Sequence, residues 1–231
     1  MPENRYFTHQ PLVTTQNVSL ENSEHRHIFK VMRGAVDDTV ELVNGKGQLA
    51  QAVITTIDKT NVDLEIVSVD SFTPPPPLIL AAALPRLNRL DFILEKGTEL
   101  GMTSLWLFPG ERSEKKTVSE NQLKRFHSIL VSAMKQSGTL FLPEIEIKPP
   151  IKKWSALPSN ACFGSLDPDA SPLIHEPSAS LVVIGPESGL TRKEESRLIT
   201  LGAKAVKLHS HILRTDTAAI CALSLMSQNY Q

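Results

Sequence analysis

The C-terminal part of the chain alternates short apolar runs with polar turns. Residues 181–184 are continuously apolar and rich in β-branched side chains, which is typical of a strand buried on both faces of a parallel sheet. A glycine-containing turn, residues 185–189, breaks the run. Thr191 follows with Glu194 three positions later, and this pair predicts a capping box at the start of a helix.

A second strand and a second helix come next. Residues 203–208 predict the strand, residues 209–215 a loop, and the almost wholly apolar residues 218–226 a buried helix, which we expect Thr215 or Asp216 to cap. Loops at the carboxyl ends of neighbouring parallel strands are where open α/β sheets bind ligands. The two turns are therefore a candidate ligand site, although the residues alone leave open that they are ordinary strand-to-helix connections.

The middle of the chain repeats this alternation. Predicted strands span residues 78–84, 103–108 and 161–166, and predicted helices span residues 88–100 and 120–137, ending at Gly101 and Gly138. Strands that alternate with helices indicate βαβ units and a mostly parallel sheet, so the fold class is α/β. No GxGxxG fingerprint or P-loop follows any of these strands, and the histidine, cysteine and acidic residues lack metal-ligand spacing.

The N-terminal part has the alternating pattern of a small β domain, which we expect over residues 1–72. A hairpin signal lies at residues 44–47. The predicted strands span residues 39–43, 48–54 and 61–69. Residues 73–77, a threonine followed by four prolines, predict a stiff linker. We therefore place the domain boundary there, with a second domain over residues 78–231.

A basic helix is expected just before the hairpin, over residues 25–33. Its apolar positions at helical spacing are Ile28, Val31 and Met32, and the basic positions free to face outwards are Arg26, Lys30 and Arg33. Arginine and lysine on such a face add sequence-independent affinity for phosphates. The alternative is an ordinary solvated helix face, which charged runs usually form.

Composition narrows the class of protein. The chain has 231 residues, of which 41% are hydrophobic, and a formal net charge of −1, so any nucleic-acid site must be a local patch rather than a basic domain. The first ten residues lack the apolar core of a signal peptide and no apolar run approaches a membrane span, so we expect a cytoplasmic protein. Cys162 and Cys221 stand in apolar surroundings and are expected to be buried free thiols.

Several short motifs occur in a characteristic order along nearly the whole chain. They are residues 5–7 (RYF), 27–33, Asp38, Arg89, residues 95–101 (EKGTELG), 111–113 (ERS), 136–137, 142–145 (LPEI), 185–190 (GPESGL) and 212–218 (ILRTDTA). Each motif alone is weak, but their order and spacing are specific. Together they resemble the RsmE family of 16S ribosomal RNA uridine-N3 methyltransferases, which belong to the SPOUT class.

The resemblance implies a fold and a cofactor. The fold would be an N-terminal PUA-like RNA-binding β-barrel followed by a SPOUT α/β domain with a C-terminal trefoil knot, and the active form a homodimer. The cofactor would be S-adenosyl-L-methionine, held by the loops that follow three strands. The cofactor-binding residues implied are Leu166, Asp167, Ile184, Gly185, Pro186, Glu187, Gly189, Leu208, Ile212, Leu213, Thr215 and Ala218.

The implied reaction is transfer of a methyl group to N3 of a uridine. N3 carries a proton at neutral pH, so the site must stabilise the negative charge that its loss leaves on the pyrimidine. Arg214 is the candidate catalytic residue because a guanidinium is always charged and presents a fork of donors. The alternative role of Arg214 is an ion pair with Glu187 or Asp216. No general base is assigned, since Glu187 could serve only if burial raised its pKa.

The implied substrate is 16S ribosomal RNA in the small ribosomal subunit. Candidate RNA-binding residues are Arg26, Lys30, Arg33, Arg86, Arg89, Arg112 and Gln136, although each arginine could equally be a surface residue. The chain departs from the family pattern at Thr139, Ser188 and His211, where the family usually has arginine, glycine and arginine. Those departures leave two alternatives open: a catalytically weak RNA-binding relative, or a methyltransferase that acts on a different RNA.

Overall fold

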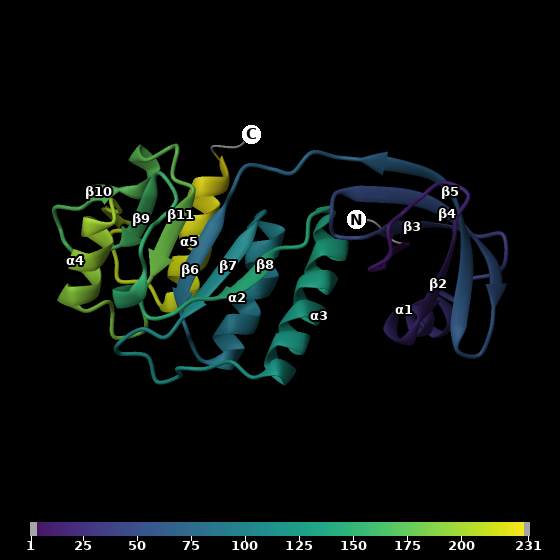
Figure 1. Cartoon of the computed structure of the whole chain (residues 1–231), viewed down its shortest axis with the longest axis horizontal. Coiled ribbons are helices and arrows are strands. Elements are labelled where there is room, and N and C mark those ends of the chain that lie inside the picture. The colour runs from purple at the N-terminus through teal and green to yellow at the C-terminus, as the bar shows by residue number, and fades with distance from the viewer. Residues whose placement is uncertain (1–3, 229–231) are drawn as a thin grey trace. The chain divides into compact units, whose positions relative to one another are not determined.

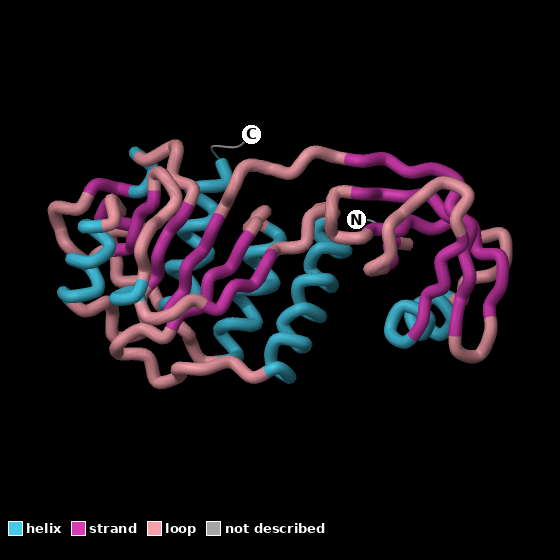
Figure 2. The backbone as a smooth tube through the Cα atoms, in the orientation of Figure 1, coloured by secondary structure: helices cyan, strands magenta, loops and turns pink. Residues whose placement is uncertain are grey.

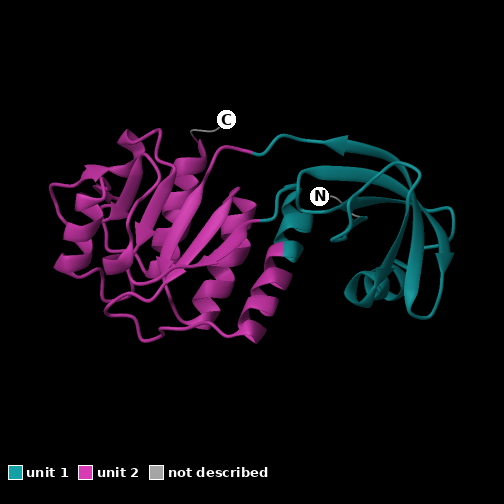
Figure 3. Ribbon diagram, viewed as in Figure 1, with its two compact units in different colours: residues 1–74, 131–142 teal, residues 75–130, 143–231 magenta. Residues whose placement is uncertain are grey.

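A computed structural model describes residues 4–228 of the chain. The chain divides into two compact units, which are coloured separately in Figure 3. Unit 1 consists of residues 1–74 with 131–142, and unit 2 of residues 75–130 with 143–231. The helix α3, Glu120–Ser137, supplies residues to both units. No helix in the described part of the chain is long and apolar enough to cross a membrane.

Unit 1 is built on a five-stranded sheet of order β1-β3-β4-β5-β2. The strands are β1 Arg5–Phe7, β2 Asn17–Glu21, β3 Thr39–Val43, β4 Gln48–Ile57 and β5 Asn61–Ser71. The β1–β3 pair is parallel and the other pairs are antiparallel. Register shifts in β4 at Gln51/Ala52 and Ile54/Thr56 increase the local twist, and the sheet curls into a half-barrel (Figure 1). The hairpin and the three predicted strands are confirmed.

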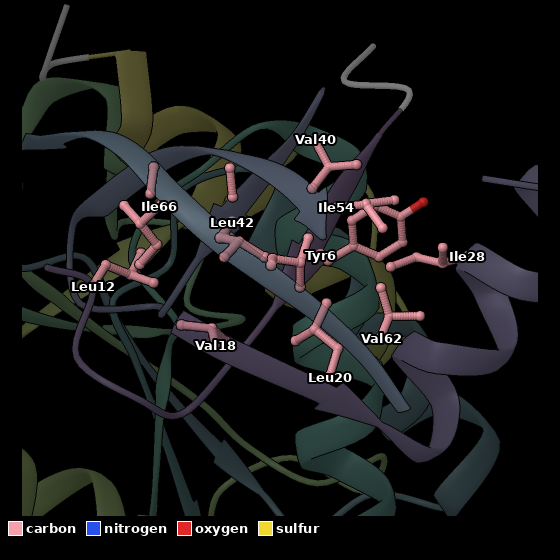
Figure 4. Close-up of a cluster of buried hydrophobic side chains, with 13 residues drawn as sticks. Tyr6, Leu12, Val18, Leu20, Ile28, Val40, Leu42, Ile54, Val62 and Ile66 are labelled. Carbon is pink, nitrogen blue, oxygen red and sulfur yellow. The ribbon is translucent and has the colours of Figure 1, made fainter. Parts of the chain in front are cut away.

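The core of unit 1 lies inside this curl. Side chains alternate along each strand: in β2, Val18 and Leu20 are buried while the three residues around them are exposed. Figure 4 shows Tyr6, Ile28 and Ile54 gathered with the other inward-facing side chains. Burying an aliphatic or aromatic side chain of this size stabilises a fold by roughly 1.5–3 kcal/mol, so the alternation holds the sheet in register.

The predicted basic helix is present but does not have the predicted apolar face. The segment starts as α1, Asn22–Arg26, and continues as a π-helix, His27–Met32. Ile28 is buried, whereas Val31 is 67% and Met32 40% exposed. Hydrogen bonds in a π-helix join residues five apart, so the chain turns less per residue than in an α-helix and Val31, three positions after Ile28, falls well short of its face. Met32 is the last residue of the segment, beside Arg33 in the left-handed conformation, and also stays exposed. The expectation that Val31 and Met32 pack inwards is therefore wrong.

Unit 2 is built on a seven-stranded sheet in which every neighbouring pair of strands is parallel. Figure 2 shows its strands in magenta. The sheet order is β10-β12-β9-β11-β6-β7-β8. The strands are β6 Ile79–Ala83, β7 Ser104–Phe108, β8 Glu144–Ile147, β9 Ala161–Gly164, β10 Ser171–Pro172, β11 Leu181–Ile184 and β12 Lys204–Lys207. The predicted βαβ alternation and parallel sheet are confirmed.

Helices cover the sheet of unit 2. The helices α2, Leu87–Glu99, and α5, Thr215–Ser227, contact each other, and α5 packs on β6 and β11 (Figure 1). The helix α4, Arg192–Thr200, contacts the short 3₁₀ helix Ile151–Lys153. Together with Trp154 and alternate residues of β6, β9 and β11, α4 and this 3₁₀ helix form one apolar cluster. Because side chains alternate across a strand, the sheet is buried on both faces.

The start of α4 matches its prediction and the start of α5 does not. In α4, Thr191 accepts a hydrogen bond from the backbone N–H of Glu194, and Glu194 accepts one from Thr191, which completes the capping box. In α5 the N-cap is Arg214, without a side-chain cap, and Thr215 is already helical. The Asp216 carboxylate accepts from its neighbour Thr217. Neither Thr215 nor Asp216 is therefore the cap.

Candidate functional site

Three loops of unit 2 converge on one pocket of about 340 Å³. They follow the carboxyl ends of β9, β11 and β12, which are neighbours in the sheet. Carboxyl ends of parallel strands meet at one edge, so loops that are far apart in sequence are brought together there. The volume lies in the range of small-molecule sites. This edge is where the sequence placed its candidate ligand site.

Most of the predicted cofactor residues line the pocket. They are Leu166, Ile184, Gly185, Pro186, Glu187, Gly189, Leu208, Ile212, Leu213, Thr215 and Ala218. Asp167 lies outside the lining: it is exposed, and its carboxylate accepts a hydrogen bond from the backbone N–H of Asp169. His209 and His211 also line the pocket, within the loop that the sequence predicted for the site. Lining residues that the sequence did not indicate are Gly164, Ser165 and Leu190. The first two were missed because β9 ends at Gly164, two residues before the predicted end of that strand.

The turn after β11 brings the main chain against the pocket. A Cβ atom added to Gly185 would lie 2.8 Å from the backbone nitrogen of Leu190, so no larger residue fits without moving the turn. Gly189 has φ of +74°, a conformation that glycine adopts without strain. Ser188 is not among the described non-glycine residues with positive φ. Serine is thus accommodated at 188 because the left-handed conformation falls one residue later.

The walls of the pocket are apolar. Leu166 is 71% and Ile212 81% exposed, and both line the pocket with Ile184 and Leu208. Large uncovered aliphatic side chains of this kind mark a site that an apolar surface covers. Aliphatic walls with close backbone approach at Gly185 suit a flat heteroaromatic ring, whose edges hydrogen-bond to main-chain groups. These residues fit the adenosyl part of S-adenosylmethionine.

The two arginines of the pocket differ in their partners. The Arg89 Nη1 atom lies 2.9 Å from the Glu187 Oε1 atom. Arg214 is exposed, and no ion pair joins it to Glu187 or Asp216 among the described residues. The alternative role of Arg214 as a partner of those carboxylates is therefore wrong. Arg214 stands at the N-terminus of α5, where the helix dipole adds to its attraction for negative charge.

Two further arginines predicted for the RNA rim are engaged near the turn. Arg112, in the loop after β7, donates from Nη1 to the Ser188 carbonyl oxygen at 2.9 Å. Arg86 donates to both carboxylate oxygens of Glu114, and its guanidinium holds the pKa of that carboxyl below its ordinary value. Both arginines remain exposed. They can therefore face a polyanion while Arg112 holds the loop after β7 against the turn and Arg86 holds the same loop against the start of α2.

The other candidate RNA-binding residues belong to unit 1. Arg26, Lys30 and Arg33 are exposed along α1, the π-helix and its C-terminal end. Gln136 is exposed near the end of α3, in the part of that helix that joins unit 1. No group of three or more histidine, cysteine or acidic residues in the described part of the chain is arranged to hold a metal ion.

Comparison with known proteins decides the family. A family model for the RNA methyltransferase domain matches residues 73–227, and a model for the RNA methyltransferase PUA domain matches residues 20–67. The crystal structure of ribosomal RNA small subunit methyltransferase E from Neisseria gonorrhoeae, bound to S-adenosyl methionine, is 30% identical. Its superposition on this protein covers 97% of both chains and has a TM-score of 0.85. The chain belongs to the ribosomal RNA small subunit methyltransferase E family.

Curated members of the methyltransferase E family match over almost their whole length. The proteins from Bacillus subtilis (strain 168) and Aquifex aeolicus (strain VF5) are 28% and 27% identical. Those alignments cover 96% and 90% of this chain and 95% and 92% of the relatives. The N-terminal and C-terminal parts of the chain therefore both correspond to parts of these family members.

One departure from the pattern of the methyltransferase E family, His211, lines the pocket beside His209. Ser188 is exposed in the turn after β11, between the lining residues Glu187 and Gly189, and is not itself part of the lining. The His211 backbone N–H donates to His209 Nδ1 at 3.1 Å, and the two rings lie 5.4 Å apart. Where the family usually carries a fixed positive charge, this chain thus has an exposed imidazole whose backbone is tied into the loop. The third departure, Thr139, is in unit 1.

Proposed function

We propose that this chain transfers the methyl group of S-adenosylmethionine to N3 of a uridine in the 16S ribosomal RNA of the small subunit. The observation that carries the proposal is that Arg214, an exposed residue in the lining of an apolar pocket, has no carboxylate partner among residues 4–228. Family membership supplies the reaction class, and the pocket supplies the place for the cofactor. The chemistry of the pyrimidine then explains why an unpaired cation stands there.

The pocket walls would hold the cofactor by packing against the faces of its flat adenine ring, and main-chain groups would hydrogen-bond to the edges of that ring. Leu166, Ile184 and Ile212 would cover the ring, and the turn at Gly185 would present main-chain donors and acceptors. Bound S-adenosylmethionine supplies a methyl group on a sulfonium. Desolvation by these aliphatic side chains would strengthen every charge interaction at the reacting atoms.

Arg214 would act on the uridine. As N3 loses its proton, negative charge spreads to the two pyrimidine oxygens, and a fork of N–H donors stabilises that charge most when it is fully developed. Glu187 is held 2.9 Å from Arg89, so an ion pair would have to break before its carboxylate could take the proton. We therefore assign the proton to solvent and a positioning role to Glu187.

The domain roles follow the same proposal. Residues 1–72 would form the PUA-like RNA-binding domain, residues 73–77 the linker and residues 78–231 the SPOUT methyltransferase domain. We further propose that the C-terminal helix is threaded as a trefoil knot and that the enzyme acts as a homodimer. A ribosomal substrate would place the enzyme in the cytoplasm. Arg26, Lys30, Arg33, Arg86, Arg89, Arg112 and Gln136 would contact the RNA.

The proposal is tested by methyl transfer to undermodified small ribosomal subunits. Purified protein is incubated with labelled S-adenosylmethionine. Part of the RNA is digested to nucleosides, which are separated by chromatography against methyluridine standards because the isomers share one mass, and the intact remainder is mapped by primer extension. We expect the label in 3-methyluridine and a new primer-extension stop at one position. Absence of transfer together with absence of cofactor binding by calorimetry would refute the proposal. Cofactor binding and RNA binding without transfer would favour the catalytically weak relative, and label in another RNA the different substrate.

Replacing Arg214 by alanine should lower turnover about 100-fold or more while changing the cofactor dissociation constant less than about threefold, because the guanidinium acts on charge that exists only in the transition state. Single-turnover methyl transfer and calorimetry measure the two quantities separately. Arg214→Lys, which keeps the charge and loses the fork, should retain part of the activity. Equal losses of turnover and cofactor affinity would contradict the assigned role.

A further inference from the structure

Phe29 presents an uncovered aromatic ring on the basic segment of unit 1. Its side chain belongs to the π-helix and is 48% exposed. Val31, Met32 and Val36, which follow it, are 67%, 40% and 51% exposed. An apolar group of this size on a surface marks a contact with another molecule more often than an isolated exposed side chain does.

The Phe29 ring is held in place from below. It stacks on the His25 ring, with centroids 5.5 Å apart and planes inclined by 14°. His25 is itself only 5% exposed, and its Nε2 atom lies 2.9 Å from the Asp58 carbonyl oxygen, to which it donates. A ring fixed in this way loses little side-chain entropy when a second flat group stacks on it, so the platform is preorganised.

The charge around the ring selects the partner. Residues 25–36 carry Arg26, Lys30 and Arg33 and no carboxylate. All three cations are exposed, and none of them has an ion pair within the described residues. The acidic residues that flank the segment are Glu24 on one side and Asp37 and Asp38 on the other. Glu24 pairs with Lys135 and Asp38 accepts the Ala35 backbone N–H, whereas Asp37 is exposed.

An aromatic ring among unpaired cations matches single-stranded nucleic acid. Successive bases stack on exposed aromatic side chains while a positive surface follows the phosphates. A duplex offers the phosphates but hides the faces of its bases. A purely apolar protein partner would gain nothing from three uncompensated cations and would have to desolvate them.

We propose that Phe29 is a stacking platform for an unpaired base of the RNA substrate, with Arg26, Lys30 and Arg33 along the adjoining phosphates. The inference rests on the proposed function, which makes the substrate an RNA. It adds that the segment recognises unpaired nucleotides rather than a helix, and it assigns that selectivity to one side chain.

The test measures the affinity of the full-length chain for two fluorescent RNA probes by fluorescence anisotropy. One probe is a 12-nucleotide single strand, and the other is a blunt duplex of the same length. Phe29→Ala should weaken the single strand at least about fivefold, in line with the loss of one stacked base, and leave the duplex within about twofold. Phe29→Tyr, which keeps the stack, should bind both probes like the unmodified protein. Val67→Ala, which trims another exposed apolar side chain on β5, is the matched control.

Two results would overturn the inference: unchanged single-strand affinity in Phe29→Ala, or equal weakening of single strand and duplex. A thermal melt within about 2 °C of the unmodified protein guards against a folding defect. Should the alanine variant fail that check, Phe29→Leu, which keeps an apolar side chain but has no aromatic face, should show the same selective loss of single-strand affinity. Methyl transfer by the unmodified protein is measured in parallel. If the unmodified protein transfers methyl groups but Phe29→Ala binds the single strand normally, the stacking platform alone is refuted. If Phe29→Ala loses its preference for the single strand but the unmodified protein transfers no methyl group, the proposed function alone is refuted.

Discussion

Single side chains in this protein differ most in whether their charge is compensated. Arg89 has Glu187, Arg86 has Glu114, and Arg214 has neither carboxylate that the sequence offered it. The Arg89–Glu187 pair joins positions 98 residues apart, and no local pattern predicts such a pairing. The sequence could therefore nominate Arg214 through its motif, but only the three-dimensional arrangement separates a free guanidinium from a paired one.

Tyr6 shows how burial among carboxylates affects a residue far from the reaction. It is 2% exposed, and burial followed by the negative charges of Glu24 and Asp38 raises its pKa to about 12. Above pH 10 the unfolded chain loses the phenol proton while the folded chain keeps it. Stability is then fully present below pH 10 and falls as the pH rises towards 12.

We expect the Tyr6 phenol to remove about 1 kcal/mol from the free energy of unfolding between pH 9 and pH 11. Urea titrations of the unmodified protein and of Tyr6→Phe at both pH values measure this. Other groups titrate alike in the two proteins, so the difference between them isolates Tyr6. A stability difference that does not change with pH would contradict the raised pKa.

Elements were predictable where their signals are local. The β11 strand, its glycine turn and the capping box of α4 lie within a few residues, and all three were predicted from the sequence. The π-helix was missed because its backbone winding is decided by how Ile28 packs into the curled sheet. The start of α5 was missed because two polar residues there both resembled caps.

Glu194 gives the α4 start a role beyond its own helix. This carboxylate is 4% exposed and accepts the backbone N–H groups of Thr191 at 2.8 Å and of Glu111 at 2.9 Å. It therefore ties the loop after β7 to the turn that lines the pocket. The Thr191 hydroxyl donates to the Glu111 carboxylate at 2.9 Å and strengthens the same junction.

Replacing Glu194 by glutamine should lower the free energy of unfolding by about 1–3 kcal/mol, because an amide nitrogen cannot accept and would face one of the two N–H donors at a side chain that is only 4% exposed. Denaturant titration checks the size of the effect. Glu195→Gln removes the same charge from the same first turn without a buried contact, so it should change stability by less than about 0.5 kcal/mol. Similar losses in both variants would assign the effect to the helix dipole instead.

At the scale of the molecule, the two compact units are not consecutive stretches of the sequence. Residues 131–142 belong to unit 1 although residues 75–130 precede them in unit 2. Val131 and Met134 pack there against Phe7 and Val43, and the Lys135 Nζ atom lies 2.7 Å from the Glu24 Oε1 atom. A proline-rich run such as 73–77 is visible in sequence, but the return of a later segment to an earlier unit depends on long-range packing that sequence patterns do not encode.

A fragment of residues 75–231 should be less stable and more prone to association than the full chain, since removal of residues 1–74 uncovers Val131 and Met134. Size-exclusion chromatography and a thermal melt would detect both effects. The same fragment with Val131→Ser and Met134→Gln should stay monodisperse at equal concentration. A parent fragment that behaves as well as this double variant would contradict the expectation.

Because residues 131–142 belong to unit 1, they also decide when that unit can finish folding during protein synthesis. Nascent domains usually fold as units, N-terminal first, while the ribosome is still adding residues. Here the first unit emerges with Phe7 and Val43 still uncovered, and their covering segment is translated only after most of α3. Completion of the N-terminal unit must therefore wait for translation to pass through part of the other unit, a delay in which a chaperone would find exposed apolar surface on the nascent chain.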